Sequence, residues 1–154
     1  KSGSLIAAAG RMGAMTSGAA ESVAVAISAY GEKFGVAFQL SDDLLDIASE
    51  SETSGKTPGT DLREGIRTLP VLLALRRTDP AEARLRELLA GPLVDDDLHA
   101  EALELLRRSP AMAEAHDELV RWAESARAEL AALPPSPQTD ALSQMCDVVV
   151  DRSA

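Results

Sequence analysis

Apolar and polar residues alternate along this chain with the spacing of helices, and glycine and proline mark the breaks between them. Residues 1–17 are rich in Ala, Leu, Met and Gly. They predict a tightly packed helix whose glycines permit close approach to a neighbour. After Gly18, residues 21–49 predict a second and much longer helix.

A polar loop over residues 51–60 separates these helices from the rest of the chain. Beyond it, prolines near helix starts and capping residues such as Thr68 set the boundaries of further helices. The predicted helices span residues 68–77, 80–89, 95–108, 110–133 and 139–150.

Composition supports this all-helical interpretation. Aromatic residues make up only 3% of the chain, and Ala and Leu dominate an apolar content of 45%. Few aromatic and β-branched runs argue against a sheet protein. We therefore predict an all-α fold, a compact piece of an antiparallel helical bundle, in which residues 1–154 show no internal domain boundary.

Charge and cysteine content exclude several classes of protein. The formal net charge is −10, and no stretch is rich in Lys and Arg, which argues against a nucleic-acid partner. Cys146 is the single cysteine, so no intrachain disulfide can form, as is usual in a reducing cytoplasm. No apolar run is long enough to span a membrane. An acidic chain that binds an anionic substrate would need bridging cations.

The most informative segment is the end of the long helix, FGVAFQLSDDLLDI. At about 100° per residue, Gln39, Asp42, Asp43 and Asp46 share one narrow arc with apolar residues on both flanks. A surface helix normally has one apolar stripe and one broad polar face. A thin acidic strip between two apolar flanks therefore indicates a helix that lines a cavity.

Three carboxylates on one arc repel each other and need a partner when they are buried. Magnesium takes oxygen ligands and is usually held by one or two carboxylates together with substrate phosphates. Asp42, Asp43 and Asp46 are therefore candidate Mg²⁺ ligands. In a chain with 25 acidic residues, a solvated helix face is the competing interpretation.

Two basic residues are weaker candidates. Lys56 follows a glycine in a loop that could cover a diphosphate, although the loop does not match a Walker A sequence. Lys1 precedes the acidic strip by about forty residues, so two antiparallel helices could bring it near the strip. Taken singly, either lysine could simply be solvated.

Together these residues resemble the trans-isoprenyl (polyprenyl) diphosphate synthase family, in its C-terminal half. The match is carried by Lys1 and Ser2 (for the family's Lys-Thr pair), by Gln39, Asp42, Asp43 and Asp46 (its second aspartate-rich motif), by Gly55, Lys56, Gly59, Asp61, Leu62 and Gly65, and by residues 68–70 (Thr-Leu-Pro). The resemblance extends to about Leu75, and beyond that it rests on helical pattern alone.

The resemblance implies half of an isoprenoid-synthase-type bundle around a deep apolar cavity. It implies an enzyme that ionises an allylic diphosphate with the help of magnesium and joins the allylic group to isopentenyl diphosphate. Asp42 would be the main metal ligand, with Asp43 and Asp46 beside it. The catalytic residues would be Lys1, Gln39 and Lys56. Substrate contacts would come from Lys1, Ser2, Gln39, Lys56 and Arg67.

One position departs from the family pattern. The family usually has Lys after the glycine matched by Gly65, where this chain has Ile66, which cannot bind phosphate. Arg67 is adjacent, but a shift of one residue on a helix rotates a side chain by about 100°. Ile66 is thus the best support for an alternative function, a non-catalytic synthase-like partner subunit.

Two further alternatives are an isoprenoid cyclase or head-to-head synthase, and a plain helical interaction module. The aspartate form of the motif favours chain elongation over the first. The family's N-terminal half, with its first aspartate-rich motif, is not in this sequence. We therefore expect a second chain or a lost segment to supply it, a homo- or heterodimer, and an inactive fragment when this half is alone.

The remaining polar residues predict structure rather than chemistry. His99 and His116 are not spaced as a metal pair and are expected to be ordinary surface or core residues. Asp95 and the two aspartates after it are expected to cap a helix. Cys146 is expected to be a small core residue.

Overall fold

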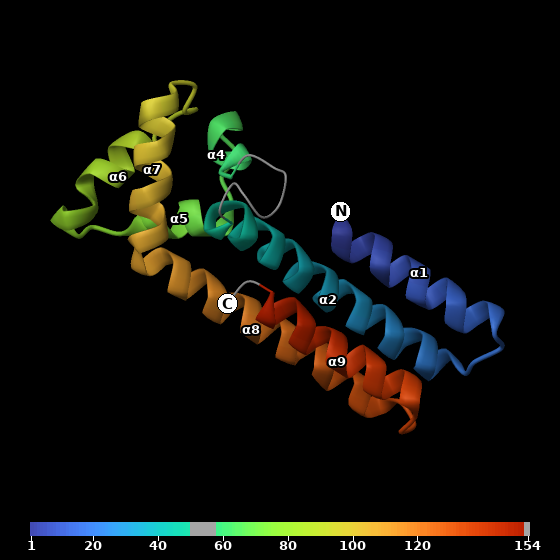
Figure 1. Cartoon of the computed structure of the whole chain (residues 1–154). Coiled ribbons are helices and arrows are strands. Elements are labelled where there is room, and N and C mark those ends of the chain that lie inside the picture. Colours follow the sequence, from blue (N-terminus) through green and yellow to red (C-terminus); the bar gives the residue numbers. More distant parts are fainter. Residues whose placement is uncertain (50–57, 153–154) are drawn as a thin grey trace. The chain divides into compact units, whose positions relative to one another are not determined.

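The computed structural model describes residues 1–49 and 58–152, and every regular element within them is a helix (Figure 1). The predicted all-α fold is confirmed for that part of the chain. Two compact units divide the chain: Lys1–Ser41 with Glu118–Ala154, and Asp42–Asp117. No described helix is long and apolar enough to cross a membrane.

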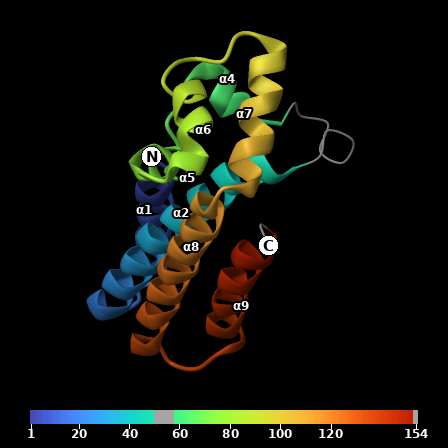
Figure 2. The same cartoon turned by 90° about the vertical axis from the view of Figure 1, so that its left-hand side faces the viewer.

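The first unit is built from long helices. Its elements are α1 (Ser2–Thr16), most of α2 (Glu21–Ala48), the end of α8 (Pro110–Glu129), the 3-10 turn η2 (Leu130–Ala132) and α9 (Pro137–Asp151). Within this unit α1 runs antiparallel to α2, and α9 runs antiparallel to the end of α8 (Figures 1 and 2). Tyr30 and Phe34 of α2 stack with ring centroids 5.5 Å apart and are both buried.

Glycines allow α1 and α2 to approach at backbone distance, as the sequence predicts. A Cβ added to Gly31 would lie 2.9 Å from the Cα of Ala7, and one added to Gly35 would lie 2.5 Å from the Cα of Gly3. Real Cβ atoms do not approach other atoms so closely. These contacts therefore require glycine.

Helix α9 is tied to α2 by polar contacts as well as by packing. The Tyr30 hydroxyl donates to the carbonyl of Leu142 at 2.9 Å. Arg152 donates to the hydroxyl of the fully buried Ser41 at 2.8 Å and stacks over the ring of Phe38. Cys146 has no exposed surface, which confirms that it is a core residue.

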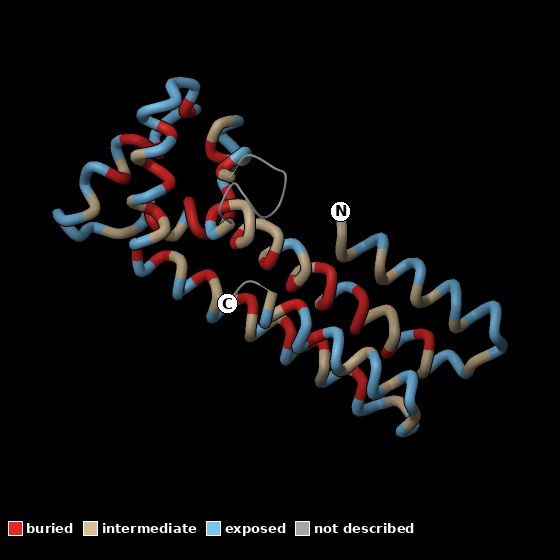
Figure 3. The backbone as a smooth tube through the Cα atoms, viewed as in Figure 1, coloured by how far each residue is buried: buried red, intermediate tan, exposed pale blue. Residues whose placement is uncertain are grey.

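The second unit packs short helices around the end of α2. Its further elements are α4 (Thr60–Glu64), α5 (Leu69–Arg76), the 3-10 turn η1 (Pro80–Glu82), α6 (Ala83–Leu88), α7 (Asp96–Arg108) and the start of α8. Helix α7 buries one face, made by His99, Ala102, Leu103 and Leu106 (Figure 3). This spacing is that of an amphipathic helix on a core.

Most helix starts agree with the sequence, and the start of α9 does not. The predicted cap of α7 is confirmed, because the Asp95 carboxylate accepts from the amides of Asp97 and Leu98 at 3.0 Å each. Thr68 takes the N-cap position of α5, but its hydroxyl makes no capping bond. Helix α9 begins at Pro137, because proline suits the first turn of a helix as well as a break.

Candidate active site

The candidate site lies at the carboxyl end of α2, in the second unit. Asp42, Asp43 and Asp46 are each partly buried. Leu44, which lies between them, and Ile47, which follows Asp46, are buried. Apolar packing therefore fixes this turn of helix and holds the carboxylates at the border of the core. The predicted apolar flanks thus have a structural basis.

The end of α2 is held from outside by an arginine. Arg107 of α7 donates to the backbone carbonyls of Ile47 and Ser49, both at 2.7 Å. The last carbonyls of a helix have no partner within the helix, and a guanidinium satisfies them while complementing the negative end of the dipole. Arg107 therefore stabilises the end of α2.

Asp46 binds the next described turn of the chain through three atoms. Its carbonyl accepts from the amide of Gly59 at 2.8 Å. Its two carboxylate oxygens accept from the amides of Thr60, at 3.3 Å, and Asp61, at 3.2 Å. Asp46 thus caps the first turn of the short helix α4, although it lies 14 residues before that helix in the sequence. Each carboxylate oxygen keeps a second lone pair that a cation could use.

His99 holds the other side of the same turn. Its Nε2 lies 2.8 Å from the carbonyl oxygen of Gly59, and the side chain is only 5% exposed. Since a carbonyl only accepts, Nε2 carries the proton. Gly59 has φ +70°, and a Cβ there would lie 2.8 Å from Nε2 of His99. Both the backbone conformation and the histidine therefore require glycine.

Asp61 brings a further carboxylate to the end of α2. Burial and the negative charges of Asp46, Asp43 and Glu64 raise the pKa of Asp61, in that order of importance. Among the described residues, the charges that shift the pKa of Asp61 all belong to carboxylates. A cation would relieve this repulsion.

The arrangement is an open one rather than a preformed metal cage. Within residues 1–49 and 58–152, no group of three or more His, Cys, Asp or Glu side chains is placed to hold a metal ion by itself. Magnesium does not need such a cage, because it keeps waters and uses one or two carboxylates plus substrate phosphates. Hard oxygen donors that lie close together on one stretch of helix fit that requirement.

Lys1, Ser2 and Gln39 belong to the first unit. The Ser2 hydroxyl donates to Oε1 of Gln39 at 3.1 Å, which confirms that the start of α1 lies beside this part of α2. The bond also identifies Nε2 as the donor end of the Gln39 amide. Lys1 is exposed at the beginning of α1.

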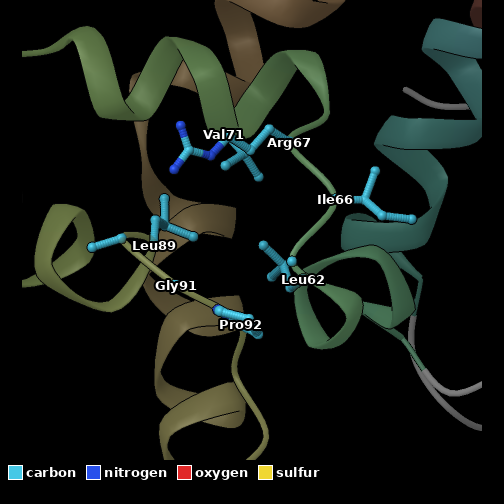
Figure 4. A pocket seen from close by; sticks show the side chains of 9 residues that line it. Leu62, Ile66, Arg67, Val71, Leu89, Gly91 and Pro92 are labelled. Carbon is cyan, nitrogen blue, oxygen red and sulfur yellow. The ribbon is translucent and has the colours of Figure 1, made fainter.

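Arg67 and Ile66 lie on the link between α4 and α5. They border a small apolar cavity of about 120 Å³ whose lining also includes Leu62, Val71 and Leu89. In Figure 4 the Arg67 guanidinium and the Ile66 side chain extend in opposite directions. Arg67 therefore does not place its charge where the side chain of Ile66 lies. Lys56 lies outside the described residues.

Three residues of this site are not among the sequence-based candidates: Asp61, His99 and Arg107. Asp61 belongs to the motif residues, but a pattern of spacings does not show that its carboxylate joins those of α2. His99 and Arg107 come from α7, some forty to sixty residues later. The one sign of these contacts in the sequence is the glycine at position 59, where a side chain would collide with a neighbouring residue.

Comparison with known proteins places this site in a family. The model of the polyprenyl synthetase family matches residues 1–106. A nonaprenyl diphosphate synthase of Mycobacterium tuberculosis is 54% identical over 152 residues, which cover 99% of this chain and 45% of that protein.

Solved structures agree in fold as well as sequence. A geranylgeranyl pyrophosphate synthase from Corynebacterium glutamicum, complexed with calcium and isoprenyl diphosphate, superposes with a TM-score of 0.92 at 46% identity, over 100% of this chain and 48% of that one. A polyprenyl synthase from Caulobacter crescentus, complexed with the same two ligands, gives 0.84 at 37% identity, over 97% and 46%.

The chain thus spans about half the length of the relatives it matches. Sequence and fold agree over nearly the whole of it, and the matched region includes the acidic end of α2 and the turn that Asp46 holds. The chain therefore belongs to the polyprenyl synthetase family.

Proposed function

We propose that this chain is the C-terminal part of a single polyprenyl synthase domain, in a magnesium-dependent polyprenyl diphosphate synthase. The enzyme would condense isopentenyl diphosphate with an allylic diphosphate. The observation that carries this proposal is the cluster of carboxylates at the end of α2, where burial, Asp46 and Asp43 raise the pKa of Asp61. Relatives of matching sequence and fold bind calcium and an isoprenyl diphosphate.

Asp42 and Asp43 would hold the divalent cation, with Asp46 contributing a remaining lone pair. When bound, the cation would neutralise the diphosphate as it leaves and lower the barrier to ionisation. Calcium in the relatives indicates a hard divalent cation, and magnesium is the ion we propose here because it prefers phosphate and a few carboxylates.

The residues of the chain would orient the substrate. The Gln39 amide is oriented by the hydrogen bond from Ser2 to its Oε1. Gln39 would contact the allylic diphosphate or the region of the nascent cation through Nε2. Lys1 would add a positive charge at the same end of α1, and Arg67 would be a more distant contact. Apolar neighbours of the aspartates would exclude water, which strengthens each of these interactions.

The alternative of a non-catalytic partner subunit rests on Ile66 alone. Ile66 is 47% exposed, and its side chain extends in the direction opposite to the Arg67 guanidinium (Figure 4). An inactive homologue need not keep a full set of carboxylates. The synthase is therefore the function that we propose. A homo- or heterodimer in the cytoplasm remains our prediction for its assembly and location.

Activity of the native protein tests the proposal. The protein would be incubated with farnesyl diphosphate, labelled isopentenyl diphosphate and Mg²⁺, and elongated products would be measured. Asp42→Asn should reduce kcat by at least roughly 100-fold, since it removes a charge that acts in the transition state. Asp117→Asn, on the exposed side of α8, is the matched control and should leave kcat unchanged.

Two results would contradict the proposal. One is an Asp42→Asn protein that elongates substrate as fast as the Asp117→Asn control. The other is a native protein that makes no product with any allylic diphosphate while it binds a second synthase-like chain, which would favour the partner subunit.

A further inference from the structure

A histidine from α7 supports the turn that faces the carboxylates of α2. Gly59 is hydrogen-bonded on both sides: its amide donates to the carbonyl of Asp46, and its carbonyl accepts from His99. The next two amides, of Thr60 and Asp61, donate to the carboxylate of Asp46. The peptide units from Gly59 to Asp61 are thus fixed between α2 and α7.

The orientation of this turn determines which hydrogen bonds the Asp46 carboxylate accepts, and so how the carboxylate is oriented. With His99 in place, the turn directs two N–H groups at the Asp46 carboxylate and sets Asp61 beside it. Without the hydrogen bond from His99, the buried Gly59 carbonyl would keep only its bond from the Arg63 amide, at 3.1 Å. A glycine at positive φ would then be held less firmly, because it has no side chain to restrain its backbone.

We propose that His99 is a positioning residue for the metal site, and that its Nε2–H bond to Gly59 holds the turn that orients Asp46 and Asp61. This inference rests on the proposed function for the identity of the ligand, but the hydrogen-bond geometry is independent of it. Groups that orient metal ligands from behind commonly change metal affinity by 10- to 100-fold when they are lost.

Other contacts make α7 a suitable support. Arg107, two turns further along the helix, fixes the end of α2. Arg63 of α4 forms an ion pair with Asp96 at the start of α7, at 2.8 Å. Helix α7 therefore holds both α2 and α4, and His99 lies between these two attachments on its buried face.

Two substitutions that differ by one methylene separate positioning from packing. Glutamine places an amide N–H the same number of bonds from Cβ as Nε2 of histidine, whereas asparagine falls one bond short. His99→Gln should therefore keep the bond to Gly59, and His99→Asn should lose it. His116→Asn is the control, because Nε2 of His116 has no hydrogen-bond partner among the described residues.

The experiment measures amide hydrogen exchange of the native protein without metal, and then Mg²⁺ affinity in the presence of inorganic pyrophosphate. His99→Asn should speed exchange of the Thr60 and Asp61 amides by roughly tenfold, the effect of one lost hydrogen bond. It should weaken Mg²⁺ binding by roughly tenfold or more. His99→Gln should recover most of both, and His116→Asn should change neither.

Three outcomes would overturn the inference. His99→Asn could match the native protein in both measurements, His99→Gln could be as impaired as His99→Asn, or exchange could accelerate throughout the second unit rather than at the turn. Failure of the proposed function is distinguishable, because it would appear as full activity in Asp42→Asn while the exchange pattern at residues 60 and 61 still followed position 99.

Discussion

At the scale of single residues, the molecule accepts a local electrostatic cost at Asp61. The carboxylate is partly buried among Asp43, Asp46 and Glu64, and burial and their charges raise its pKa. A carboxyl whose folded-state pKa is raised destabilises the fold once it ionises. The cost is therefore absent below about pH 4, where the group is protonated in both states. It grows as the pH rises through the folded pKa.

Asp61→Asn should accordingly stabilise the metal-free protein, by about 0.5 kcal/mol at neutral pH or a rise of about 1–2 °C in Tm. The gain should be larger at neutral pH than near pH 4. Thermal unfolding followed by circular dichroism measures it, with Asp117→Asn as the control. A gain that is equal at the two pH values, or greater near pH 4, would contradict this account.

Individual residues also show what sequence can and cannot predict. Asp95 as a helix cap and Cys146 as a core residue follow from local chemistry, and both are confirmed. The acidic strip follows from helical periodicity. The roles of His99 and Arg107 cannot be predicted in this way, because their partners are backbone carbonyls far away in sequence. No pattern of side chains encodes such contacts.

At the scale of elements, the α1–α2 pair depends on glycine where the backbones meet. Gly31→Ala would set a Cβ 2.9 Å from the backbone of Ala7, whereas a Cβ at Gly13 of α1 would meet nothing within 4 Å. Both substitutions gain helix propensity, about 1 kcal/mol. Their difference therefore isolates the contact.

Gly31→Ala should destabilise the protein by about 1–3 kcal/mol, and Gly13→Ala should stabilise it slightly. Urea unfolding midpoints measure both effects. If the two variants were equally stable, the close approach of α1 and α2 would not be a feature of the folded protein.

Long elements are predicted better than short ones. Helices α1, α2 and α7 begin and end within about two residues of their predicted limits, because periodicity and capping signals act together there. The short helix α4, over Thr60–Glu64, is not among the predicted helices, since it falls between the predicted loop and the helix predicted from residue 68. Five residues show no period, and this helix is stabilised by Asp46 and by glycines at both ends rather than by its own sequence.

At the scale of the whole molecule, a net charge of −10 opposes the binding of any diphosphate. Divalent cations would therefore carry the interaction. Binding of inorganic pyrophosphate to the native protein should be at least roughly tenfold weaker in EDTA than in Mg²⁺, as measured by titration calorimetry. Sodium chloride of equal ionic strength should not replace Mg²⁺. Equal affinity with and without the metal would contradict the bridging role.

The whole-molecule comparisons also explain the limits of the sequence prediction. Fold class and family follow from an ordered set of motifs that spans both units. The division into two units cannot be predicted from the sequence, because no proline-rich or glycine-rich linker separates them. Their boundary falls within α2 and α8, and a helix gives no compositional sign where its packing partner changes.

The guanidinium cap on α2 has a consequence for recombining related synthases. Because Arg107 closes the last turn of α2 through main-chain carbonyls, it recognises the position of those atoms and not the side chains that carry them. A chimera that exchanges the segment around α7 should tolerate many differences at its surface. It must retain an arginine at this position, or the end of α2 would fray and the spacing of its aspartates would be lost.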